Sequence, residues 1–148
     1  MKKALLDTNI LSHFLRGQGN VVAKLNEYGQ FYDFLTFSIL TYYEIKAGLT
    51  YRDSGKLLNQ FEEIARESEI LHLYLPTMDI ASKIHADLRQ QGVAIAPIDL
   101  LIAASAIEHN CTLITANVRH FQNIDGLRYE NWAQWAIDTY SDGALRYR

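Results

Sequence analysis

The chain has few of the features that mark secreted, membrane-spanning or zinc-binding proteins. Its 148 residues include a single cysteine, Cys111, so no intramolecular disulfide can form and we expect a cytoplasmic location. No apolar stretch approaches the roughly 20 residues of a membrane-spanning helix, and Asp7 interrupts the start before a signal peptide's apolar segment can form. The five histidines are scattered, without the spacing of a zinc site. We expect Cys111 to be a buried residue on a strand.

Positive charge and phosphate-binding loops are also scarce. The formal net charge is −3, which disfavours binding of nucleic acid over a broad basic face, so an RNA substrate would need a local patch or a bound metal ion. Neither Gly-x-x-x-x-Gly-Lys nor Gly-x-Gly-x-x-Gly occurs, which argues against P-loop and dinucleotide-binding functions. Asn9 stands two residues after Asp7, so the Asp-x-Asp pattern of haloacid-dehalogenase-like phosphatases is absent.

The composition predicts one folded domain. Hydrophobic residues make up 49% of the chain and charged residues 21%, close to the average for folded proteins and far from the composition of disordered ones. A chain of this length can bury a core without disulfides or metals. We expect the domain to cover residues 1–135 and a polar, frayed tail to follow at 136–148.

The apolar periodicity alternates between strand and helix. Strands are predicted to end at Leu6 and to cover 34–39, 70–75, 111–114 and 127–129. Helices are predicted from Ile10 to Gly17, from Asn20 to Gly29, from Thr41 onwards, over 57–65, from Thr77 to Gly92 and from Asp99 to Ile107, with Asn20, Thr41 and Thr77 as expected caps. This order predicts an α/β fold with a central parallel sheet of four to five strands and helices on both faces.

Three acidic residues fall where predicted strands pass into helices. Asp7 follows the first strand, Glu44 lies one turn into the helix after the second, and Asp99 opens the helix that leads to the fourth. The carboxyl ends of such strands border the functional crevice of a parallel sheet. Carboxylates gathered there repel one another, and a divalent cation relieves that repulsion. Magnesium prefers such oxygen ligands and can activate water for phosphodiester hydrolysis.

Each acid also has a structural alternative. Asp7 and Asp99 would serve as helix caps, and Glu44 would be the reciprocal partner of Thr41 in a capping box. The occurrence of all three at equivalent strand-to-helix transitions favours a shared site over three separate caps.

Four ordered motifs carry a family resemblance: LLDTN at 5–9, TYYE at 41–44, DLLIAA at 99–104 and LITANVRHF at 113–121. Together they resemble the PIN domain, and Gly126–Leu127 with Glu130–Asn131–Trp132 resemble the end of VapC-type toxins of bacterial toxin–antitoxin pairs. The resemblance covers about Leu5 to Trp132 in the expected order and implies a three-layer PIN-like fold.

The resemblance implies that Asp7, Glu44 and Asp99 form the catalytic metal site of an endoribonuclease. It implies Mg²⁺ as cofactor, with Mn²⁺ expected to substitute, an RNA substrate, a VapB-like antitoxin, a homodimer and a toxin–antitoxin hetero-oligomer. Many PIN domains carry a fourth acid where this chain has Asn117, whose amide brings hydrogen bonds but no charge.

Further polar residues adjoin this edge. Asn9 would orient a carboxylate or serve turn geometry, and Thr115 would bond a metal-bound water or be an ordinary strand residue. Arg16, Lys46 and Arg119 are candidates for contacts with RNA phosphates, and His120 is another. Their alternative is a solvated surface.

One competing function follows from Asn117. A catalytically silent PIN-like binding module would keep the fold and its partner but lose hydrolysis. Magnesium affinity and RNA cleavage distinguish it from the nuclease.

Overall fold

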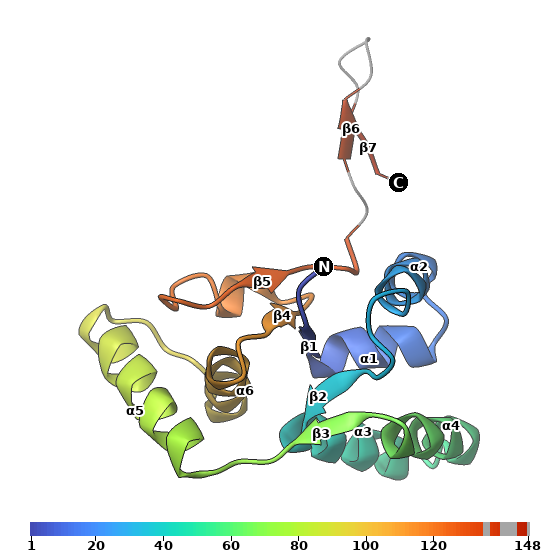
Figure 1. The fold of residues 1–148 in the computed structure, drawn as a ribbon, viewed down its shortest axis with the longest axis horizontal. Helices are drawn as coiled ribbons and strands as arrows, with labels where there is room; N and C mark the ends of the chain where they lie inside the picture. The colour runs from blue at the N-terminus through green and yellow to red at the C-terminus, as the bar shows by residue number, and fades with distance from the viewer. Residues whose placement is uncertain (135–136, 140–144, 148) are drawn as a thin grey trace.

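The computed structural model describes residues 1–134, 137–139 and 145–147 (Figure 1). Its strands are β1 Ala4–Leu6, β2 Thr36–Ser38, β3 Glu69–Leu71, β4 Thr112–Ile114, β5 Tyr129–Glu130, β6 Ile137–Thr139 and β7 Leu145–Tyr147. Its helices are α1 Thr8–Leu15, α2 Gly19–Tyr28, α3 Ile39–Tyr51, α4 Gly55–Arg66, α5 Leu75–Gln90 and α6 Pro97–Glu108, with a 3₁₀ turn, η1, at Val118–His120.

The central strands run parallel, as the sequence predicts. In one ladder β4 lies between β1 and β5, with Leu5 opposite Leu113, and in a second ladder β2 pairs with β3. Strand β1 also contacts β2, so the five strands lie in the order β3-β2-β1-β4-β5 although their hydrogen bonds form two ladders. The parallel α/β fold is therefore confirmed, with the pairing divided between those two ladders.

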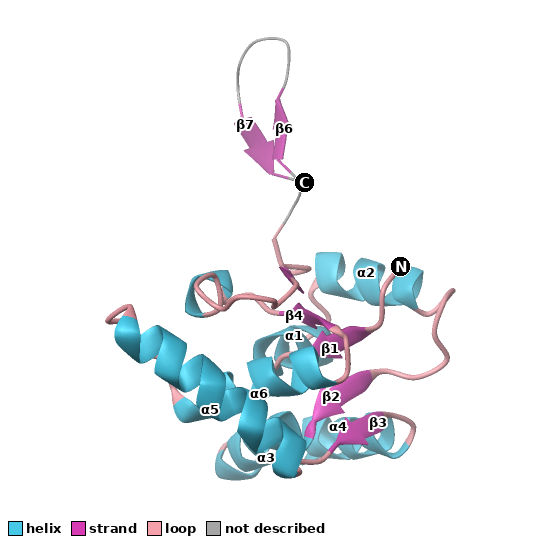
Figure 2. Ribbon diagram, turned by 60° about the vertical axis from the view of Figure 1, so that its left-hand side comes forward, coloured by secondary structure: helices cyan, strands magenta, loops and turns pink. Residues whose placement is uncertain are grey.

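Helices cover both faces of these strands because successive strand residues point to opposite sides. Ala4 and Leu6 pack with the helices α1 to α4, whereas Leu5 packs with α5 and α6. Figures 1 and 2 show the same division into three layers. Every residue of β1, β2 and β4 is buried, as expected for parallel strands that are covered on both sides. Cys111, expected on a strand, is buried directly before β4.

Two predicted helix starts are wrong because an earlier residue takes the cap. Helix α3 begins at Ile39, where the Ser38 hydroxyl accepts a hydrogen bond from the Leu40 amide, and Thr41 is buried within the helix. Helix α2 begins at Gly19, so Asn20 lies inside it and its side-chain amide donates to the Ala133 carbonyl.

Proline sets the starts of α5 and α6. Pro76 and Pro97 lie in the first turn of these helices, where the missing N–H has no helical partner to lose. Thr77 is therefore the third residue of α5, and Asp99 the third of α6, rather than the residue before the helix. The Thr77 hydroxyl still caps the start of α5, because it accepts a hydrogen bond from the Tyr74 amide at 3.2 Å. Strand β3 ends at Leu71, before the predicted end at residue 75, and Leu75 is 80% exposed at the start of α5.

The helix ends agree better with the sequence. Gly17 and Gly92 have positive φ angles of 77° and 71°, a conformation that glycine adopts without a steric cost. Helix α2 ends before Gly29 as predicted, although this glycine keeps a right-handed φ.

Beyond the domain, β6 and β7 pair antiparallel, so these two segments form a ladder where a frayed tail was expected. The predicted boundary at residues 135 and 136 lies outside the described residues and stays a prediction. No helix in the described part of the chain is long and apolar enough to cross a bilayer.

Candidate metal centre

Asp7 is buried and hydrogen-bonded at the carboxyl end of β1. Its backbone N–H donates to the Ile114 carbonyl at 2.8 Å, which extends the β1–β4 ladder by one residue. Its side chain is both a cap and a buried acid: Oδ1 accepts from the Thr8 amide at 2.8 Å, and Oδ2 accepts from the Thr115 hydroxyl at 2.8 Å. Asp7 is only 4% exposed. Asp7 therefore caps α1, as one alternative predicted, and also lies at the edge where the site was predicted.

The surroundings of Asp7 disfavour its negative charge. Burial raises the pKa of this carboxyl above the ordinary 3.8, and the nearby Asp99 and Glu44 carboxylates raise it further. The hydrogen bonds from Thr115 and Thr8 act in the opposite direction, since they stabilise the ionised form. The three predicted acids therefore lie close enough to interact electrostatically.

Glu44 reaches this edge from α3. Its Oε1 accepts a short hydrogen bond of 2.6 Å from the Thr8 hydroxyl, which also lies 3.2 Å from the hydroxyl of Thr41. The capping-box alternative for Glu44 is wrong, because Ser38 caps the helix. Thr8 and Thr41 instead link α1 to α3 beneath the carboxylate.

Asp99 projects from the first turn of α6. Since Ala96 is the residue before the helix, the alternative of a capping Asp99 is wrong as well. Its Oδ2 lies 3.1 Å from Nδ1 of His120, on η1. His120, which the sequence offered as a contact for phosphate, thus pairs with one of the predicted metal ligands.

The auxiliary residues split into two groups. Thr115 is completely buried and donates to Asp7, so it holds the carboxylate itself. Asn117 is exposed, and its backbone N–H donates to the Thr115 hydroxyl at 3.0 Å. Asn9 accepts from the Ala116 amide at 3.1 Å, so it ties the start of α1 to the segment that follows β4, a contact between residues 107 positions apart.

The donor chemistry of this edge fits a hard divalent cation. In the part of the chain that the structure describes, no three His, Cys, Asp or Glu side chains converge on a single metal position. Magnesium sites, however, use one or two carboxylates with water and substrate phosphate rather than a complete protein cage. Asp7 offers two buried carboxylate oxygens, each with one hydrogen bond, and Glu44 and Asp99 offer further oxygens nearby. A cation would remove the repulsion that raises the Asp7 pKa.

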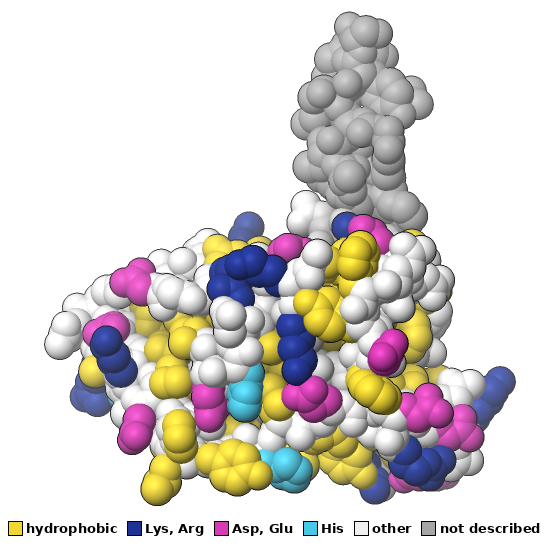
Figure 3. All heavy atoms as spheres, in the orientation of Figure 1, with side chains coloured by type: hydrophobic (Ala, Val, Ile, Leu, Met, Phe, Trp, Pro, Cys, Tyr) yellow, Lys and Arg dark blue, Asp and Glu magenta, His cyan; other side chains and the backbone are white. Residues whose placement is uncertain are grey.

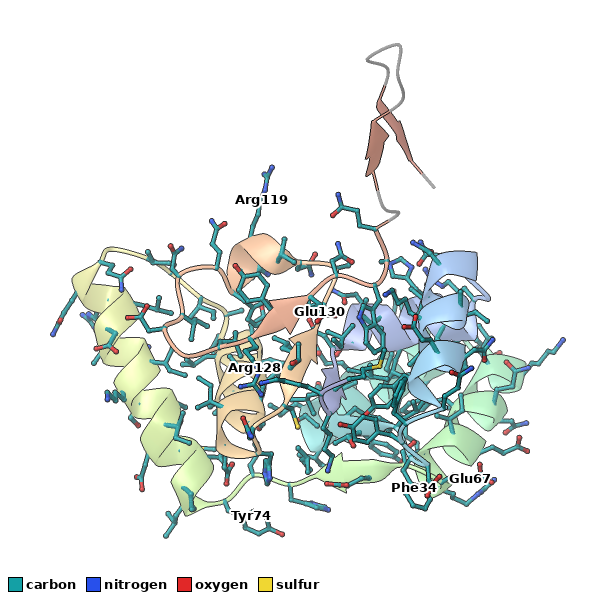
Figure 4. The ribbon with its side chains drawn as sticks, turned by 45° about the horizontal axis from the view of Figure 1, so that its top comes forward. Phe34, Glu67, Tyr74, Arg119, Arg128 and Glu130 are labelled. Atoms are coloured by element: carbon teal, nitrogen blue, oxygen red, sulfur yellow. The ribbon has the colours of Figure 1, made fainter. Side chains whose placement is uncertain are left out.

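Basic side chains around the site are local rather than spread over a face. On the face in Figure 3, acidic and basic side chains are interspersed. Of the predicted phosphate contacts, Arg119 points away from the body (Figure 4), and Lys46 pairs with Glu62 at 3.4 Å. Arg16 lines a cavity together with Glu44. Arg52, which the sequence analysis missed, lines the same cavity.

The family model described as the PIN domain matches residues 4–127, and the chain belongs to this family. Among curated relatives, Ribonuclease VapC1 of Haemophilus influenzae (strain R2866) is 29% identical over 134 residues, 88% of this chain and 98% of the relative. Toxin FitB of Neisseria gonorrhoeae is 33% identical over 138 residues, 86% and 97% of the two chains. The structure of DNA-bound VapBC from Salmonella typhimurium has a TM-score of 0.78 at 25% identity and covers 89% of this chain and 99% of that one.

Proposed function

We propose that this protein is a metal-dependent endoribonuclease and the toxin of a bacterial toxin–antitoxin pair. One observation carries the proposal: a buried carboxylate, Asp7, is fixed at the end of β1 with Glu44 and Asp99 close enough to raise its pKa. The ribonuclease and toxin relatives, which align over nearly their whole lengths, support the same function.

In this proposal Asp7 and Asp99 hold Mg²⁺, or Mn²⁺ in its place, and Glu44 helps to hold the ion or its water. Nucleases of this family generally depend on divalent metals. A bound ion would polarise the phosphodiester and lower the pKa of a water for in-line attack.

The chain's own residues orient these ligands. Thr115 fixes one oxygen of Asp7 and the Thr8 amide fixes the other, while the Thr8 hydroxyl orients Glu44. Asn117 is proposed to bond a water or a metal ligand through its amide, in place of a fourth acid. A manganese-bound crystal structure with the Asn117 amide remote from the ion would exclude that role.

The proposed partners are RNA, a VapB-like antitoxin, and a second copy of the chain in a toxin–antitoxin hetero-oligomer. The two-component VapBC assemblies among the similar solved structures support this partner. The exposed Tyr43 and Tyr51 of α3 provide aromatic surface suited to protein contacts. The proposed site of action is the cytoplasm, where RNA is available.

Controlled expression in bacteria tests the proposal. Wild-type protein should arrest growth and generate discrete new RNA 5′ ends, and folded Asp7→Asn protein should do neither. Wild-type protein that is soluble and folded yet gives neither arrest nor new ends, and also fails to bind magnesium, would favour the silent binding module.

A further inference from the structure

A small cavity runs from the acidic site along the groove between α1 and α3. Its volume is about 70 Å³. Its polar lining joins Thr8 and Glu44 of the site to Ser12, Arg16 and Arg52, and the rest of the lining is apolar: Leu15, Ile45, Leu49 and Leu57. Binding sites for drug-sized organic ligands are usually about 300 Å³ or larger. The cavity is therefore too small for a nucleobase or a protein helix, and its two arginines would bind a single small anionic group.

The α3 side of the cavity carries Glu44 and Arg52. Glu44, Gly48 and Arg52 recur every fourth residue, so they share one face of the helix. The Arg52 side chain folds back over this face, and its Nε donates to the Gly48 carbonyl at 3.3 Å. A Cβ on residue 48 would lie 3.3 Å from a terminal nitrogen of Arg52, which is tighter than most contacts of this kind. With its Nε on the Gly48 carbonyl, the guanidinium lies about one helical turn, ~5.4 Å, from the position of Glu44 along the axis.

The α1 side repeats the pattern. Thr8, Ser12 and Arg16 also recur every fourth residue, which places a hydroxyl at each of the first two positions and a guanidinium at the end. Over the described ranges, the ion pairs found involve neither Arg16 nor Arg52. Both arginines end their helices, where positive charge is favourable, but that explains neither their shared cavity nor its connection to Glu44.

We propose that Arg16 and Arg52 bind the RNA backbone phosphate adjacent to the one being cleaved. Guanidinium groups bind phosphate through paired, charge-assisted hydrogen bonds, and the Ser12 hydroxyl adds a further donor. One helical turn is comparable with the separation of neighbouring phosphates along a strand. A local pair of arginines also resolves how a chain of net charge −3 retains RNA beside three carboxylates. This inference rests on the proposed ribonuclease function.

RNA affinity in an inactive background tests the pair directly. The Asp7→Asn substitution prevents cleavage of the RNA during the measurement. Binding of a short fluorescein-labelled oligouridylate is then measured by fluorescence anisotropy over a series of salt concentrations. Adding Arg52→Gln or Arg16→Gln should raise Kd by about tenfold and reduce the slope of log Kd against log salt by about 0.7 for each lost phosphate contact. Arg52→Lys keeps the charge but loses the paired donors, so its Kd should lie between the Kd of the Asp7→Asn parent and that of Arg52→Gln in the same background.

Arg66→Gln is the matched control, because it removes the same charge from an exposed position at the end of α4. Its Kd should stay near that of the Asp7→Asn parent. In the active protein, Arg52→Gln should raise KM for RNA with little change in kcat. If Arg52 only capped its helix, the substitution would lower the melting temperature and leave KM unchanged.

Three results would overturn the inference. If the parent binds RNA and Arg52→Gln matches Arg66→Gln in Kd and salt slope, the arginine site is wrong while the ribonuclease proposal stands. The same holds if the Arg52 effect is confined to inhibition by the antitoxin, which would assign the cavity to a protein contact. If the wild-type protein does not cleave RNA and the Asp7→Asn parent does not bind it, the ribonuclease proposal fails and the inference fails with it.

Discussion

Asp7 and Glu44 carry the same kind of group at the same edge of the molecule, but the fold holds them differently. Asp7 sits at the end of a buried strand, and its backbone and both carboxylate oxygens are hydrogen-bonded. Glu44 projects from a helix into a partly exposed position and has one hydrogen bond, from Thr8. In the proposed mechanism, the strand fixes one oxygen pair in place, and the helix provides a carboxylate that adjusts to the ion and the substrate.

Removing the hydroxyl that supports each carboxylate gives the largest contrast. Thr115→Val should lower metal affinity and cleavage by roughly 10–100-fold, because groups that orient a metal ligand commonly contribute this much. Thr8→Val should cost less, since Glu44 is not fixed by burial. Cleavage rates across a manganese titration measure both effects, and equal losses would contradict the comparison.

The same substitution carries a pH signature. The Thr115 hydrogen bond lowers the Asp7 pKa by stabilising the carboxylate, so its loss should raise that pKa. The acidic limb of the rate profile should then move to higher pH in Thr115→Val. A limb that stays in place would mean that Asp7 ionisation does not control activity.

Neutralising the two acids should affect stability differently. Burial raises the folded-state pKa of Asp7, so the unfolded chain ionises more readily than the folded one as pH rises above 3.8. Stability is therefore lost through the window between that value and the raised pKa, and the cost persists at neutral pH.

Asp7→Asn should consequently raise the melting temperature of the metal-free protein at neutral pH, by about 2–4 °C for each kcal/mol recovered. Glu44→Gln should leave it nearly unchanged. Added Mg²⁺ should stabilise wild-type protein and not Asp7→Asn, because only a state that binds the ion gains from it. Thermal melts with and without EDTA check this, and a lower melting temperature for Asp7→Asn would show that its hydrogen bonds outweigh its charge.

Gly48→Ala should produce the smallest effect, and it should change protein stability and RNA affinity in opposite directions. Alanine is favoured over glycine within a helix by about 1 kcal/mol, so the melting temperature should rise slightly. The new methyl group would displace the exposed Arg52 side chain by a few tenths of an ångström, which should weaken RNA binding modestly. A more stable variant with unchanged affinity would show that Arg52 need not lie over Gly48.

The sequence predicted the parts of this site that depend on local order. An acid directly after a buried apolar run identified Asp7, and strand-to-helix alternation placed Glu44 and Asp99 at the same edge. The starts of α3, α5 and α6 were predicted two to three residues late, since Thr41, Thr77 and Asp99 resemble caps while Ser38 and the two prolines determine the actual starts.

Contacts between distant elements could not be predicted in this way. The hydrogen bond from Thr8 to Glu44 joins residues 36 positions apart, and it exists only because α1 packs against α3. The role of Arg52 likewise depends on the cavity that this packing leaves. The sequence signal for Arg52 was its spacing of four residues from Gly48 and eight from Glu44. That spacing places the three residues on one face of a helix, but it does not tell which element packs against that face.

Cleavage of RNA by purified wild-type and Asp7→Asn protein, with Mg²⁺ and with EDTA, tests the central claim most directly. Wild-type protein should produce discrete fragments only with the metal, and Asp7→Asn, shown to be folded by circular dichroism, should be slower by roughly a hundredfold or more. Equal rates for the two proteins, or cleavage that persists in EDTA, would contradict a metal-dependent nuclease centred on Asp7.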